Sequence, residues 1–162
     1  MTTTTPPPWV NTGNPDLLPV RCRIDVNGSW MDINDGQHFV LEASTMQDFQ
    51  VQWRKKEVQS PYLPGTWVVQ AVKDNVQENL VVWVRGSDHY EMTTYLHRLT
   101  DALDQLYYAI WWKVDTDEFA WHCQVADYQV SADRDLRHAS ICKVSAKVPR
   151  YPEVEHTEGR MF

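Results

Sequence analysis

The sequence is poor in cysteine and glycine. Its three cysteines, Cys22, Cys123 and Cys142, are odd in number and widely separated, which argues against a disulfide framework and against a zinc site built from cysteines. Three buried free thiols are expected instead, and they favour a reducing compartment. The six glycines are scattered among expected turns, so the chain has no glycine-rich loop that cradles a phosphate.

The sequence also lacks a targeting signal and a membrane span. Residues 1–8 contain four threonines and three prolines, without the basic flank and apolar run of a signal peptide. No stretch approaches the roughly 20 apolar residues that a membrane-spanning helix needs. We therefore expect no membrane partner.

Catalytic motifs are missing as well. There is no nucleophile elbow and no His-Glu-x-x-His helix. His97 and Asp101 stand four residues apart, as metal ligands can, but no third ligand accompanies them and a solvated helix face explains them. His122 and Cys123 are neighbours on an expected strand, so their side chains face opposite sides. The sequence thus predicts no enzyme activity, no cofactor and no metal site.

Positive charge is scarce. The chain has 15 Lys and Arg against 22 Asp and Glu, giving a net charge of −7 and a pI near 5.2. It shows no basic stripe of the kind that binds nucleic acid, and its one basic cluster, 54–56, is followed by Glu57. An acidic protein can still surround DNA, because repulsion keeps the DNA from adhering to it.

The length of 162 residues and the hydrophobic fraction of 43% fit one domain with its own core. Residues 1–19, rich in threonine and proline, predict an N-terminal arm, with Pro6-Pro7-Pro8 favouring polyproline II. Residues 20–148 form the expected domain. Residues 149–162 are polar and are expected to trail over the surface as a C-terminal tail.

Alternating polarity predicts strands. Val20–Val26 alternates with period two and runs into Asn27-Gly28, a tight-turn signal. Both faces of the expected strand Asn79–Arg85 are apolar, so we expect both faces to be covered by other parts of the protein. Residues 127–136 are expected to form a loop. Further strands are expected at Trp30–Ile33, His38–Glu42, Phe49–Trp53, Thr66–Lys73, Asn79–Arg85, Ala109–Val114, Glu118–Val125 and Ala139–Val148.

One long amphipathic helix is expected at about 89–107. Asp88 and Glu91 are spaced as a capping box at its start. An apolar stripe follows at spacings of three and four: Met92, Tyr95, Leu96, Leu99, Leu103 and Leu106. The fold class is therefore mainly β (α+β), a β-sandwich with one long helix packed on it.

Two features suggest contacts between subunits. Residues 54–65 mix charge with two prolines and predict a long loop, either a surface excursion or an arm to a neighbour. Trp111 and Trp112 are adjacent, so on a strand one packs beneath the helix and the other needs a second layer or a neighbouring chain. The candidate inter-subunit contacts are therefore Lys55, Lys56, Tyr62, Leu63, Trp111 and Trp112.

The order of elements from Asn79 to Val148 carries a resemblance. A strand Leu-Val-Val-Trp-Val-Arg-Gly-Ser precedes the helix, then a hairpin ends in Trp-His-Cys-Gln-Val-Ala-Asp-Tyr, and a last strand runs into Val-Pro-Arg-Tyr-Pro. In this order the chain resembles the tail proteins of long-tailed (siphovirus-type) bacteriophages, especially the minor tail and distal tail proteins of actinobacterial phages. The resemblance covers roughly residues 20–152.

The resemblance implies a tail-tube-like β-sandwich that forms a ring, commonly a hexamer, at the tail tip of the virion after assembly in the host cytoplasm. It implies tail-tube, hub or baseplate and tape-measure proteins as partners, with DNA passing through the channel without specific binding. A long loop between early strands usually reaches a neighbouring subunit, and residues 54–65 match its place. The alternatives are a major tail-tube or tail-adaptor subunit and, in another class, a small carbohydrate-binding module that uses Trp30 or Trp67.

Overall fold

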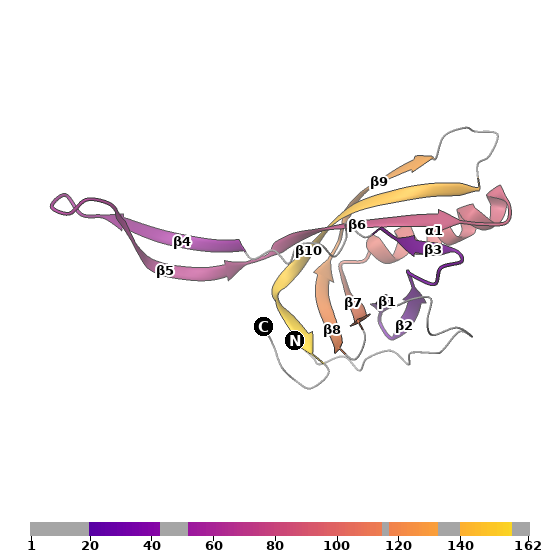
Figure 1. Ribbon diagram of the computed structural model, residues 1–162, viewed down its shortest axis with the longest axis horizontal. Coiled ribbons are helices and arrows are strands. Elements are labelled where there is room, and N and C mark those ends of the chain that lie inside the picture. The colour runs from indigo at the N-terminus through magenta and orange to yellow at the C-terminus, as the bar shows by residue number, and fades with distance from the viewer. Residues whose placement is uncertain (1–19, 43–51, 115–116, 133–139, 157–162) are drawn as a thin grey trace.

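The computed structural model describes residues 20–42, 52–114, 117–132 and 140–156, which form strands around one helix (Figure 1). The helix α1 spans His89–Leu103. The strands are β1 Val20–Val26, β2 Ser29–Asp32, β3 Phe39–Leu41, β4 Gln52–Gln59, β5 Thr66–Asp74, β6 Val76–Arg85, β7 Tyr107–Val114, β8 Asp117–Gln124, β9 Asp127–Ala132 and β10 Ile141–His156. The mainly β class with one helix is confirmed. The expected arm at 1–19 and the expected strand residues 49–51 lie outside the described residues.

Eight strands form one antiparallel sheet, in the order β2-β1-β7-β8-β10-β6-β3, with β9 paired to β10. This sheet curls into a nearly closed barrel (Figure 1), while β4 and β5 form a separate two-stranded sheet. Within the described residues there is thus one curled sheet where the sequence predicted a sandwich of two. The physical reason is that only residues 33–38 join β2 to β3, so the two edges of the sheet must lie close together.

The side-chain amide of Asn34, in the connection between β2 and β3, links β1 to β3 across the opening of the barrel. Its Nδ2 donates to the carbonyl of Val20 in β1 at 2.7 Å, and its Oδ1 accepts from the backbone N–H of Leu41 in β3 at 3.2 Å. One side chain therefore satisfies backbone groups on two strands that do not pair with each other, as buried polar backbone requires.

The longest strand, β10, holds the barrel together. Its first part pairs with β6 on one side and with β9 on the other, and its last part pairs with β8. The change of pairing partner occurs at a register shift between Arg150 and Val154, and Figure 1 shows that β10 is bent along its length. Extra residues in one strand of an antiparallel pair bend it in this way. The predicted start of the C-terminal tail, at residue 149, is therefore too early, because β10 continues to His156.

A buried ion pair lies at this bend. Arg150 and Glu78 are 2% and 4% exposed, and the Nε and Nη2 atoms of Arg150 lie 2.9 and 2.8 Å from Oε1 of Glu78. The guanidinium also lies 5.3 Å from the ring centroid of Trp121 and donates from Nη1 to the carbonyl of Tyr151. Both charges are thus satisfied in the interior, where an unpaired charge is costly.

The apolar core fills the curled sheet and receives one face of α1. Helix residues Met92, Leu99 and Leu103 are buried against side chains from β1, β3, β6, β7, β8 and β10. On β6 the buried residues alternate, with Leu80, Val82 and Val84 pointing inward, while Val81 and Trp83 are only half-buried. The expectation that both faces of this strand are covered is therefore only half met.

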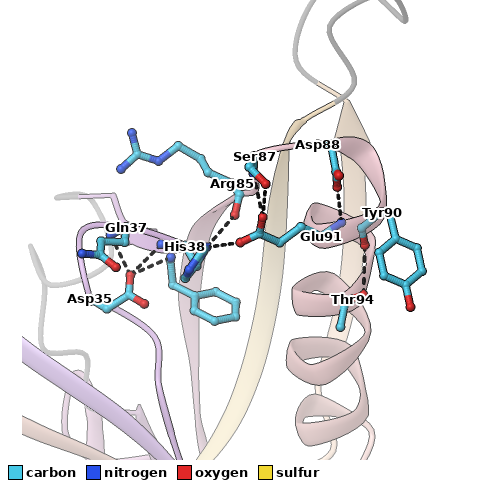
Figure 2. A network of polar contacts seen from close by, with 10 residues as sticks. Asp35, Gln37, His38, Arg85, Ser87, Asp88, Tyr90, Glu91 and Thr94 are labelled. Atoms are coloured by element: carbon cyan, nitrogen blue, oxygen red, sulfur yellow. Dashed lines mark hydrogen bonds and ion pairs between the residues drawn. The ribbon is translucent and has the colours of Figure 1, made fainter.

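The helix α1 begins where the capping residues Asp88 and Glu91 predicted it would (Figure 2). Asp88 is the N-cap and accepts from the backbone N–H of Glu91 at 2.7 Å. The Glu91 carboxylate accepts from the hydroxyl and the backbone N–H of Ser87, and these hydrogen bonds lower its pKa. It also lies 3.5 Å from Nδ1 of His38, whose ring stacks on Tyr95. These contacts join the helix start to the loop before β3.

Gly86 makes this connection possible. A Cβ added at Gly86 would lie 2.4 Å from the backbone nitrogen of Met92, closer than such atoms approach. A side chain at this position would therefore separate the end of β6 from the first turn of α1, so the close approach requires glycine.

The helix ends earlier than predicted. Asp104 is its C-cap, Leu106 is 72% exposed, and Tyr107 already belongs to β7. The backbone N–H of Ala126, in the break between β8 and β9, donates to the carbonyl of Leu103. The tertiary contact thus satisfies a helix-end carbonyl that a longer helix would have used internally.

The structure also corrects two smaller expectations. Residues 127–132 of the expected loop form β9, which pairs with β10 from Asp127 to Ala132. Trp111 and Trp112 are 1% and 0% exposed within the single chain. Trp112 joins the main core beside Phe119 and Trp121, and Trp111 packs on the outer side of the sheet with Ala109, Ala120 and Trp30.

Replacing Arg150 with Met should lower the free energy of unfolding by about 3–5 kcal/mol, because Glu78 is left as an unpaired buried charge. The double variant Arg150→Met, Glu78→Leu should lose less, since no charge then remains in the interior. Urea unfolding followed by tryptophan fluorescence would measure both. A single variant that loses under about 1 kcal/mol would contradict the cost assigned here to an unpaired, buried Glu78.

Candidate functional site: the projecting hairpin

The β4–β5 hairpin projects away from the barrel as a separate arm (Figure 1). Eight residues of β4 pair with β5, so the paired region is about 25 Å long at the usual rise per residue. Residues 60–65 connect the strands. Pro61 and Pro64 lack the N–H that a strand would donate, and Gly65 adopts a φ of +97°. The turn therefore stops strand pairing and reverses the chain.

Cross-strand side-chain pairs explain why these residues form a hairpin. Val58 lies opposite Trp67, and Trp53 lies opposite Lys73, whose Nζ is 5.8 Å from the indole centroid. Aromatic and β-branched pairs of this kind stabilise antiparallel strands. A register shift between Lys56 and Glu57 adds one residue to β5 and twists the ribbon further.

The hairpin exposes apolar side chains along its whole length. Each of them is at least 44% exposed: Trp53, Val58, Tyr62, Leu63, Trp67, Val68, Val69 and Val72. A two-stranded hairpin is marginally stable by itself in water, and a large exposed apolar surface is typical of an interaction site. These residues therefore form a candidate protein-binding surface.

The charge of the hairpin is opposite to that of the rest of the chain. Residues 52–74 contain four basic residues and two acidic ones, which gives the hairpin a formal charge of +2. Because the whole chain has a net charge of −7, the residues outside the hairpin together carry −9. The basic side chains Arg54, Lys55 and Lys56 are exposed on β4, and Lys73 is half-buried on β5. This separation of charge favours contact between the hairpin and an acidic surface.

The structure places four of the six predicted contact residues together. Lys55 and Lys56 lie on β4, and Tyr62 and Leu63 lie in the turn, 91% and 55% exposed. The predicted loop at 54–65 is instead the end of β4 and the turn of a hairpin. Trp111 and Trp112 are buried within their own chain, so their predicted role at a subunit surface is not supported.

Sequence reasoning missed the apolar part of the hairpin. The sequence pattern places Trp53 and Trp67 in ordinary strands and Val58 in the loop, although aromatic and β-branched residues stand on both sides of the Pro-Tyr-Leu-Pro-Gly turn. That symmetry is a hairpin signal. The sequence gives no sign that the apolar side chains on both strands of this hairpin are exposed.

The described residues offer little for catalysis or metal binding. They contain no group of three or more His, Cys, Asp or Glu side chains that is arranged to hold a metal. Burial raises the pKa of the Cys22, Cys123 and Cys142 thiols, which keeps them protonated and unreactive. His122 contacts Glu155 at 2.5 Å rather than Cys123. None of the described helices is long and apolar enough to cross a membrane.

Comparisons with known proteins identify structural neighbours only. No family model and no curated protein sequence matches the chain. Among the solved structures that match are two with a TM-score of 0.59 at 10% sequence identity: the baseplate of phage P2 in its activated conformation with Ca, and the same baseplate with Sr. Each match covers 82% of this chain and 43% of the matched chain. This similarity shows that the fold is shared with a phage baseplate protein.

Shortening the hairpin should leave the barrel intact. Because Lys55 and Ala71 are register partners, an Asn-Gly turn can join them in place of residues 56–70. We expect the free energy of unfolding to change by less than about 1 kcal/mol, since the removed residues are exposed. Leu80→Ala is the control that should cost about 2–5 kcal/mol in the core. Thermal and urea unfolding would compare them, and a large loss in the shortened chain would contradict the independence of the arm.

Proposed function

We propose that this chain is a structural component of a phage tail or baseplate, without enzyme activity, and that it assembles into a ring through the β4–β5 hairpin. The observation that carries the proposal is the hairpin itself: an arm about 25 Å long with exposed apolar side chains on a barrel otherwise built around its own core. The shared fold with a phage baseplate protein supports the setting in the virion.

Within this setting, the distal tail or minor tail position is the one we propose, with the chain forming a homo-oligomeric, six-membered ring around the DNA channel. Its other partners would be tail-tube, hub or baseplate and tape-measure proteins. The net charge of −7 suits a channel wall, because DNA that is repelled passes without binding. A tail-tube or tail-adaptor subunit uses the same assembly principle and is the alternative position.

A carbohydrate-binding module is the alternative from another class. Trp30, one of its two suggested stacking platforms, packs against the buried cluster of Trp111, Ala109 and Ala120. The other platform, Trp67, is 58% exposed but stands on the hairpin among other exposed apolar residues. A row of apolar side chains on an arm fits a protein contact better than a single sugar-stacking site.

The solution mass of the purified chain tests the proposal. Light scattering over a range of concentrations should give a discrete ring-sized oligomer for the natural chain. The chain with the Asn-Gly turn in place of 56–70 should remain a monomer, because it lacks six of the eight exposed apolar side chains of the arm and retains only Trp53 and Val72. A natural chain that stays monomeric at every concentration would contradict the ring, and a glycan-binding screen would then test the carbohydrate alternative.

A further inference from the structure

A second exposed apolar patch lies at the C-terminal end of α1. Leu106, Tyr107 and Val125 are 72%, 66% and 46% exposed. Tyr107 is the register partner of Gln124, so Leu106 and Val125 flank the same pair at the open end of β7 and β8. The hydrogen bond from the Ala126 N–H to the Leu103 carbonyl attaches this end of the sheet to the helix.

Carboxylates surround this apolar patch. Asp101 and Asp104 lie in the last turn and at the C-cap of α1, and Asp127 begins β9; all three are exposed. Asp104 accepts from the hydroxyl of Tyr128 at 3.2 Å, which places β9 beside the helix end. We call Leu106, Tyr107 and Val125 with these three aspartates the α1-end patch.

The helix makes this position electrostatically unfavourable for the aspartates. The C-terminal end of a helix carries partial negative charge, which favours basic residues there. The last turn of α1 contains no basic residue, although it contains Asp101 and is followed by the C-cap Asp104. Asp101 and Asp104 therefore concentrate negative charge at the helix end, and a cationic partner would relieve their repulsion. Asp127 already has Lys147 as its register partner on β10.

The hairpin has the matching properties. It carries exposed apolar side chains together with Arg54, Lys55 and Lys56, and it is the basic part of an otherwise acidic chain. We propose that the hairpin of one copy docks on the α1-end patch of the next copy, with its lysines facing the aspartates. This inference rests on the proposed ring assembly and names the two surfaces that meet in it.

The geometry argues for a second copy as the occupant. Figure 1 shows the hairpin pointing away from its own barrel, and its own α1-end patch remains exposed. A contact between two hairpins would bring like charges together and is disfavoured for that reason. Because donor and acceptor are different surfaces, the contact is heterologous, and repetition of such a contact closes a ring when the rotation permits.

Complementary charge reversal tests this contact in the full-length chain. One variant carries Lys55→Glu and Lys56→Glu on the hairpin, and the other carries Asp101→Lys and Asp104→Lys on the patch. For each variant alone, the protein concentration at half-maximal association should rise at least about tenfold. A tenfold rise corresponds to about 1.4 kcal/mol, and the coupling energy of charge pairs at interfaces reaches this value. An equimolar mixture should recover association, because each hairpin then meets a patch of opposite charge.

Two controls separate charge from folding. Asp117→Lys with Glu153→Lys makes the same change in net charge at exposed residues outside the patch and should associate like the natural chain. The Asp101→Lys, Asp104→Lys variant should keep its thermal midpoint within a few degrees, because lysine is favourable at a helix C-terminus and this gain offsets the loss of the exposed hydrogen bond from Tyr128 to Asp104. Light scattering measures the association, and circular dichroism measures the midpoint.

The outcomes distinguish the two proposals. If the natural chain forms rings and the patch variant also does, the α1-end patch is not the acceptor, although the ring proposal stands. If both variants are weakened and their mixture does not recover, the direct contact between hairpin and patch is overturned. If the natural chain itself remains monomeric, the ring and this contact are overturned together.

Discussion

The bend of β10 at Arg150 determines how the rest of the molecule is arranged. Before the bend, β10 pairs with β6; after it, β10 pairs with β8, so the same strand belongs to both sides of the barrel. The buried Arg150–Glu78 pair lies at this point. Arg150 is also the register partner of Val76, the first residue of β6, so barrel pairing ends where the hairpin begins. The arm leaves the barrel there because β10 has turned away and no longer offers β5 a partner.

The arm and the barrel divide two physical tasks between them. The barrel buries its apolar residues around α1 and needs no partner for its core. The hairpin exposes its apolar residues, and it holds the basic charge that the barrel lacks. The residues that stabilise the barrel are therefore different from the residues of the candidate protein-binding surface.

Local signals in the sequence were sufficient for most elements. Period-two alternation identified β1, and the apolar run in Asn79–Arg85 identified β6. Asn27-Gly28 forms the expected turn with positive φ at both residues, and Asp88 with Glu91 marks the helix start. The errors occurred at boundaries where a tertiary contact decided the outcome. Leu106 continues the apolar spacing of the helix, but the Ala126 N–H binds the Leu103 carbonyl and β7 begins soon afterwards.

The mainly β class and the single amphipathic helix could be read from the sequence alone, as could the lack of recognisable catalytic motifs and the choice of residues 54–65 as a candidate contact segment. These follow from patterns over a few neighbouring residues. The tertiary structure decided which of the six predicted contact residues are accessible. Trp111 and Trp112 look like Trp53 and Trp67 in sequence, but the first two are covered in the barrel and the others stand on an arm. Burial depends on residues far apart in the chain, such as Arg150 beside Val76, and a local pattern carries no information about them.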